Sequence, residues 1–161
     1  MSLKLSKRLS KIVDLCEPVD TIIDVGTDHG KVPITIANLG LSKNVIAIDN
    51  KPGPLDACRK NAELFITNKD VIFKPLLSDG LDKIDKGIES GIIITGIGFD
   101  NMKDIIKDIN EYNFKYLILS PHTKITELIK LLSTLNIDVI EQTNVFEDDK
   151  YYYIIKAVKG K

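Results

Sequence analysis

Several features are scarce in this sequence, and each scarcity excludes a class of protein. The two cysteines, Cys16 and Cys58, fall on apolar faces of predicted helices without zinc-site spacing, so we expect buried free thiols and no metal site. No apolar run approaches a membrane span and the N-terminus has no signal-type hydrophobic segment, which favours a cytoplasmic location. Neither sign of charge is in large excess: the formal net charge of -1 argues against a protein that coats nucleic acid, although a nearly neutral chain can still carry a local basic patch.

The order of apolar runs indicates a single α/β domain over residues 1–161, since no repeat, linker or low-complexity tract divides the chain. Short buried-strand patterns alternate with helical patterns, which is typical of βαβ units. Strands are predicted at 21–25, 45–48, 71–73, 92–95, 116–119, 137–140 and 151–158. Helices are predicted at about 4–16, 31–40 and 55–66, around 102–109, and around 125–135.

The end of the chain distinguishes between Rossmann-like folds. The link between the last two predicted strands is too short for a crossover helix, so these strands must be antiparallel neighbours. A nicotinamide-binding Rossmann sheet does not normally end this way, whereas the class I methyltransferase variant does. We therefore expect a seven-stranded, mostly parallel sheet with an antiparallel last strand and helices on both faces.

The turn after the first predicted strand is the first candidate site. Gly26 lets the backbone approach a ligand, and Asp28 occupies the second glycine position of a dinucleotide motif. A carboxylate is unfavourable beside a pyrophosphate but suits the sulfonium, amino group and ribose of S-adenosylmethionine. We expect Gly26, Thr27 and His29 to contact this cofactor. The alternatives are an ordinary turn with Asp28 as a helix N-cap, and a His29 that caps the helix or orients Asp28.

Acidic turns end the next two predicted strands. Asp49, followed by Asn50, can accept both hydroxyl hydrogen bonds of a ribose. Asp79 can accept the amino group of an adenine, with Gly80 making the turn. The alternatives are a solvated loop carboxylate for Asp49 and a helix N-cap at Ser78 or Asp79.

Candidate substrate contacts follow the fourth and fifth predicted strands. Gly96 and Gly98 favour close approach of cofactor and substrate, and Pro121 and His122 lie at the same sheet edge. A lone loop histidine is more often a polar surface residue than a substrate contact.

The first predicted helix has a basic face. Such a run is usually a solvated surface, but it can also contact phosphates, and we expect Lys7 and Arg8 to bind substrate there. The basic residues are Lys4, Lys7, Arg8 and Lys11.

Four motifs, in order, resemble the bacterial tRNA (adenine-22-N1)-methyltransferase family of the TrmK type. They are Lys4–Leu9, Asp24–His29, Asp79–Leu81 and Gly96–Gly98. The Asp-x-Gly-Ser/Thr-Asp-His run and the opening Lys-Leu-Ser-x-Arg-Leu are far more specific than a generic glycine loop, and the resemblance covers essentially the whole chain. It implies S-adenosylmethionine without a metal, tRNA as substrate, methyl transfer to adenine N1, and Asp28 as the catalytic residue that accepts from the exocyclic amine.

The sequence departs from this family at the substrate loops. Phe99 replaces the last glycine of Gly-Met-Gly-Gly, and Ser120-Pro121-His122 stands for Gln-Pro-Asn; Asp49, where Glu is common, keeps the carboxylate. The family also carries a C-terminal helical domain, which a chain ending at Lys161 is expected to lack, so tRNA binding should be weak and salt-sensitive.

These departures leave three alternatives open. The first is a methyltransferase acting on another RNA or a small molecule. The second is a non-catalytic module that binds S-adenosylmethionine or RNA, and the third is an NAD-dependent oxidoreductase. The sequence does not predict the oligomeric state.

Overall fold

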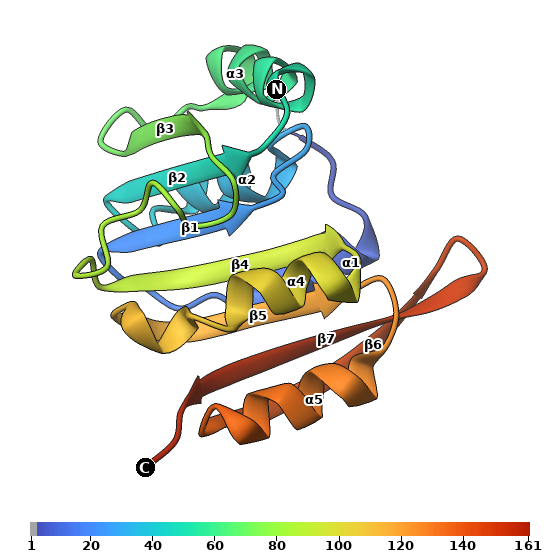
Figure 1. Ribbon diagram of the computed structural model, residues 1–161. Helices are drawn as coiled ribbons and strands as arrows, with labels where there is room; N and C mark the ends of the chain where they lie inside the picture. Colours follow the sequence, from blue (N-terminus) through green and yellow to red (C-terminus); the bar gives the residue numbers. More distant parts are fainter. Residues whose placement is uncertain (1–2) are drawn as a thin grey trace.

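The computed structural model describes residues 3–161 as one seven-stranded sheet with helices on both faces (Figure 1). The strand order is β3-β2-β1-β4-β5-β7-β6. The elements are α1 (Lys7–Leu15), β1 (Thr21–Val25), α2 (Lys31–Leu39), β2 (Asn44–Asp49), α3 (Pro52–Phe65), β3 (Ile72–Leu77), β4 (Ser90–Ile97), α4 (Phe99–Ile106), the 3₁₀ turn η1 (Ile109–Glu111), β5 (Phe114–Pro121), α5 (Ile125–Thr134), β6 (Ile137–Glu147) and β7 (Lys150–Lys159).

The pairing of the strands confirms the predicted fold class. β1 to β5 pair in parallel, and β7 inserts antiparallel between β5 and β6. The chain runs outward from β1 through β2 to β3 and then restarts at β4 on the other side of β1. This reversal opens a crevice beyond the carboxyl ends of β1 and β4, where open α/β sheets bind their ligands.

Two apolar cores hold the helices against the sheet. One packs Ile12 and Ile36, from α1 and α2, against Ile22. The other packs Met102 and Leu128, from α4 and α5, on the opposite face. All five residues of β1 are buried, because a central parallel strand is covered on both sides. Cys16 and Cys58 are free and buried, as predicted.

The first helix is shorter than predicted, since it begins at Lys7 rather than at residue 4. The Ser6 hydroxyl accepts the Leu9 N–H at 3.3 Å and caps the helix, so Lys4 precedes it. The third strand was also underestimated, because it runs on through Pro75 to Leu77. β3 is an edge strand, where a proline removes no essential ladder bond.

The predicted end of the sixth strand at residue 140 was wrong, because β6 runs on to Glu147 and takes up most of the expected link. A two-residue turn at Asp148 and Asp149, with φ of 52° and 61°, joins β6 to β7. Positive φ at both positions is the geometry of a tight hairpin turn. The hairpin projects past the ends of β4 and β5 (Figure 1). Over residues 3–161, no helix has the length and apolarity to cross a membrane.

Candidate active site

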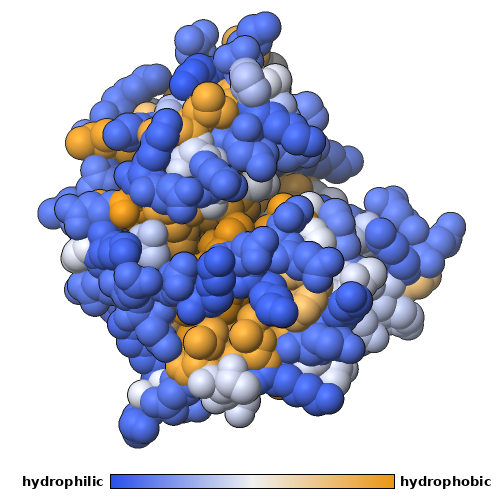
Figure 2. Space-filling view, in the orientation of Figure 1, coloured by the Kyte–Doolittle hydropathy of each residue, from blue (hydrophilic) through white to orange (hydrophobic). Residues whose placement is uncertain are grey.

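A cleft of about 1120 Å³ lies at the carboxyl edge of the sheet. Residues at the ends of β1, β2, β3, β4 and β5 line it, together with parts of α1 and α4. Figure 2 shows a hollow with a hydrophobic floor between hydrophilic rims on the face toward the viewer. This mixture of an apolar floor and polar rims suits a small organic ligand with a few polar groups.

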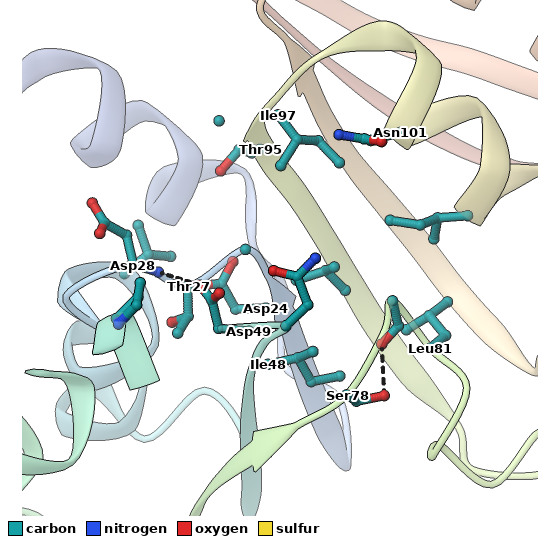
Figure 3. A pocket seen from close by; sticks show the side chains of 18 of the residues that line it. Asp24, Thr27, Asp28, Ile48, Asp49, Ser78, Leu81, Thr95, Ile97 and Asn101 are labelled. Carbon is teal, nitrogen blue, oxygen red and sulfur yellow. Dashed lines mark hydrogen bonds between the residues drawn. The ribbon is translucent and has the colours of Figure 1, made fainter. Parts of the chain in front are cut away.

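Asp24, near the end of β1, places a buried carboxylate in the cleft wall (Figure 3). Its exposed fraction is 3%, and burial raises its pKa to about 7, with the Asp49 charge adding to the rise. No ion pair neutralises it within the described part of the chain. Beside it lies the buried hydroxyl of Thr27, whose interaction with the carboxylate partly offsets the rise in the pKa of Asp24, although no hydrogen bond of good geometry to this hydroxyl forms among residues 3–161. The two groups favour a ligand that brings hydrogen-bond donors and positive charge.

The sequence prediction did not include Asp24 as a site residue. Two signals could have found it: Asp24 begins the Asp24–His29 motif, and it places a carboxylate inside a buried strand, where an unpaired charge is costly.

The loop after β1 is fixed by backbone contacts to β2. The N–H groups of Gly26 and Thr27 donate to the Ile48 carbonyl at 2.9 and 3.0 Å. Gly26 has a φ of 78°, and a Cβ there would lie 3.2 Å from the Thr95 carbonyl oxygen. Gly26 therefore allows β1 and β4 to approach closely at the edge of the cleft.

Asp28 sits in the left-handed region, with a φ of 54°, and its side chain is 74% exposed. Its Oδ1 lies 3.7 Å from Nε2 of His29. The alternative of Asp28 or His29 as a helix cap is wrong, because α2 has Gly30 at its N-cap with no side-chain capping bond. The Asp28 carboxylate is thus available at the rim of the cleft.

The Asp49 carboxylate ends β2 and organises the neighbouring loops. Its Oδ2 accepts the Asp28 N–H at 3.4 Å (Figure 3). Its Oδ1 accepts the Lys51 N–H at 3.1 Å. Each oxygen retains a second lone pair for a ligand hydroxyl. Asn50 also lines the cleft.

The loop after β3 forms the wall of the cleft opposite the loop after β1. Ser78 donates its hydroxyl to the Gly80 carbonyl at 3.2 Å and accepts the Lys83 N–H at 3.3 Å. A turn follows instead of a helix, so the alternative of an N-cap at Ser78 or Asp79 is wrong. Asp79 is exposed and lines the cleft, while a Cβ at Gly80 would lie 3.0 Å from Ile105 of α4.

The loops after β4 and β5 meet at the far end of the cleft. The His122 N–H donates to the Ile97 carbonyl at 3.0 Å. Gly96 has a φ of 72°, and a Cβ there would meet no atom within 4 Å, so its face is open. Asn101, at the start of α4, adds an amide to this wall (Figure 3).

The cleft brings together most of the predicted site residues. Those that line it are Arg8, Gly26, Thr27, Asp28, His29, Asp49, Asn50, Asp79, Gly80, Gly96 and His122. Lys7, Gly98 and Pro121 are not among the lining residues. Lys7 is exposed on α1, and Pro121 is buried at the end of β5.

On the basic face of α1, two of the four positive side chains lie close to carboxylates of β6. Lys11 lies 3.8 Å from Glu141, and Arg8 lies 3.8 Å from Glu147; both carboxylates belong to β6. Strand β6 therefore offsets two of the four positive charges. No group of three or more His, Cys, Asp or Glu residues within 3–161 is arranged to hold a metal ion.

The fold and the cleft together define a Rossmann-like methyltransferase domain. Residues 5–155 match the family described as a methyltransferase domain, and the chain belongs to this family. The chain is 26% identical over 160 residues to tRNA (adenine(22)-N(1))-methyltransferase of Bacillus subtilis (strain 168). That alignment covers 98% of this chain and 66% of the relative.

Two solved structures are similar over nearly the whole chain. The first is TrmK of M. capricolum in complex with S-adenosyl-homocysteine, with a TM-score of 0.85, 28% identity, and coverage of 98% of this chain and 70% of that one. The second is Streptococcus pneumoniae Sp1610, a putative tRNA (m1A22) methyltransferase, in complex with S-adenosyl-L-methionine. Its TM-score is 0.89 and its identity 26%, covering 98% of this chain and 74% of that one. The resemblance inferred from the motifs is confirmed.

The residues of the cleft fit S-adenosylmethionine. Asp24 offers a buried carboxylate that makes no ion pair within residues 3–161, and Thr27 offers a buried hydroxyl beside it. Asp49 offers free lone pairs at the end of β2, the position where Rossmann-like folds hold a ribose.

Proposed function

We propose that this domain transfers a methyl group from S-adenosylmethionine to N1 of an adenine in tRNA. The observation that carries the proposal is the cleft at the carboxyl edge, where carboxylates of β1, β2 and the following loops converge. The similarity to tRNA (adenine(22)-N(1))-methyltransferase supports the choice of substrate. A tRNA substrate agrees with the predicted cytoplasmic location, which stays a prediction.

Cofactor binding in this proposal uses three carboxylates in succession. Asp24 receives the amino group of the methionine moiety, Asp49 the ribose hydroxyls and Asp79 the adenine amino group. Thr27, His29 and Asn50 line the same part of the cleft, and the glycine turns at Gly26, Gly80 and Gly96 keep room for the ligand. When bound, S-adenosylmethionine supplies a methyl group already activated on a sulfonium, so the protein mainly positions the reactants.

Asp28 is the proposed catalytic residue. Its exposed carboxylate at the rim can accept a hydrogen bond from the exocyclic amine of the target adenine, which makes N1 more electron-rich. The same carboxylate can take the proton that the amine loses after transfer. An adenine within an RNA stack must be exposed or flipped to reach it. His122 lies at the far end of the same cleft and is a proposed substrate contact, as are Gly98 and Pro121 beside it and Lys7 and Arg8 on α1.

Single-turnover methylation tests this assignment. Asp28→Asn keeps the shape of the side chain but removes its charge, so the rate with saturating cofactor should fall by about 100-fold or more, while the affinity for S-adenosylhomocysteine stays close to wild type. Asp56→Asn is the matched control, because Asp56 is an exposed carboxylate of α3 outside the cleft. It should change neither the methylation rate nor the affinity for S-adenosylhomocysteine. A near-wild-type rate for Asp28→Asn would contradict the catalytic role. Cofactor binding without transfer by the wild type would favour a non-catalytic module.

A further inference from the structure

The side chain of Arg8 is held by the β6–β7 hairpin. The Arg8 backbone N–H donates to Oε1 of Glu147 at 3.1 Å, and its Nε lies 3.8 Å from Oε2 of the same carboxylate. The Arg8 Cζ lies 4.8 Å from the ring centroid of Tyr152. Both partners flank the tight turn of the hairpin, so a segment 139 residues away in sequence determines where this guanidinium points.

The guanidinium is held in place, but its hydrogen-bonding capacity is not fully used. Its Nε is buried and has no hydrogen-bond partner among residues 3–161, since 3.8 Å to Glu147 is an ion-pair distance and not a hydrogen bond. Arg8 is also one of the residues that line the cleft. A planar guanidinium, fixed by an aromatic ring and a carboxylate, is preorganised to bind an oxyanion through two parallel N–H groups.

The charge of the cleft creates a need for such a group. Its acidic lining residues are Asp24, Asp28, Asp49, Asp79, Asp82, Asp104 and Asp108. The basic ones within the described chain are Arg8, Lys31, Lys51 and Lys107, and of these Arg8 has both an ion pair and an aromatic contact. An anionic group that enters between so many carboxylates requires a positive charge held in a fixed position.

We propose that Arg8 is the oxyanion-binding residue of this cleft and that Glu147 and Tyr152 are its positioning residues. The inference rests on the proposed function, which supplies two sources of the oxyanion: the carboxylate of the methyl donor and a phosphate of the RNA. The hairpin thereby has a role in ligand binding although Glu147 and Tyr152 do not themselves line the cleft.

The chain contains matched controls for both positioning residues. Glu141 pairs with Lys11 at the same 3.8 Å and from the same strand and helix, but neither residue lines the cleft. Tyr151 neighbours Tyr152 in β7 and packs on Phe146, with ring centroids 5.0 Å apart. The side chains of Tyr151 and Tyr152 lie on opposite faces of the hairpin because they are successive residues of a strand.

The test compares Glu147→Gln and Tyr152→Leu with the controls Glu141→Gln and Tyr151→Leu. The two positioning variants should weaken binding of either S-adenosylhomocysteine or tRNA by about three- to tenfold, which is the range expected for a lost cation–π or charge-assisted contact. The kcat at saturation should change by less than about twofold. Tyr152→Phe keeps the ring and should restore wild-type binding. Thermal melting of each variant separates this effect from unfolding.

Two probes distinguish the sources of the oxyanion. If the oxyanion is the donor carboxylate, the variants lose affinity for S-adenosylhomocysteine but not for 5′-methylthioadenosine, which has no carboxylate. If it is a phosphate, KM for tRNA rises instead, and Arg8→Gln flattens the plot of log affinity against log salt by about 0.7–0.9.

Folded positioning variants that match their controls in cofactor affinity and in KM for tRNA would overturn the inference while leaving the proposed function standing. A wild-type protein that binds neither S-adenosylhomocysteine nor tRNA would overturn both.

Discussion

Replacing Asp24 by asparagine should stabilise the apo protein and weaken cofactor binding. The folded-state pKa of Asp24 is raised from 3.8 to about 7 because the carboxyl is buried. The unfolded chain therefore loses this proton at a lower pH than the folded chain, and stability falls as the pH rises from about 4 to about 7. At 1.36 kcal/mol per pKa unit, the difference is up to about 4 kcal/mol above pH 7 and about 2 kcal/mol at pH 5.

Urea unfolding of the apo protein at pH 5 and pH 8 measures this effect. The free energy of unfolding of Asp24→Asn should exceed that of the wild type by an amount that is larger at pH 8 than at pH 5. Calorimetry should show that the same variant loses at least about tenfold in affinity for S-adenosylhomocysteine, because its amino group loses a buried charged acceptor. Asp56→Asn is again the control, since its carboxylate is exposed. An Asp24→Asn variant with no pH-dependent gain would refute the account of a buried, unpaired carboxylate.

Three further results are expected. Asp49→Ala should lower the affinity for S-adenosylhomocysteine by about tenfold, because the ribose hydroxyls lose their acceptor; unchanged calorimetric affinity would remove Asp49 from the site. Gly30→Ala should lower the free energy of unfolding by about 1–3 kcal/mol, because φ is 81° and the new Cβ would lie 2.7 Å from Sγ of Cys58, whereas Gly53→Ala, which meets no atom within 4 Å, should not lower it. Binding to tRNA should be weak and should fall with rising salt in mobility shifts, and tight, salt-insensitive binding would contradict a phosphate contact by α1.

The parallel part of the fold was predictable from sequence because apolar strands and helical patterns alternate there. Strand β1, predicted at 21–25, begins and ends at those residues. The full length of strand β6 was not predictable, because the apolar pattern covers Ile137–Ile140 and the rest of the strand is largely exposed. Its partner β7 supplies the hydrogen bonds that extend it to Glu147, and in an exposed strand the preference for β-structure depends on the cross-strand neighbours more than on the apolar pattern of the segment itself.

The candidate site was predictable where turn residues mark strand ends, as at Asp28, Asp49 and Asp79. Arg8 was singled out as one residue of a basic face, but nothing in the sequence links it to Glu147, whose 139-residue separation is bridged only by the folded sheet. Asp24 was missed because its importance depends on burial, which converts an ordinary carboxylate into one with a pKa of about 7.

The most direct test of the proposed function is the identity of the methylated nucleoside. The wild-type protein is incubated with labelled S-adenosylmethionine and bulk tRNA from cells that lack the modification, and the digested tRNA is analysed for labelled nucleosides. The account predicts N1-methyladenosine, with the signal lost in Asp28→Asn. Label in another nucleoside, or no label despite S-adenosylhomocysteine binding, would contradict it.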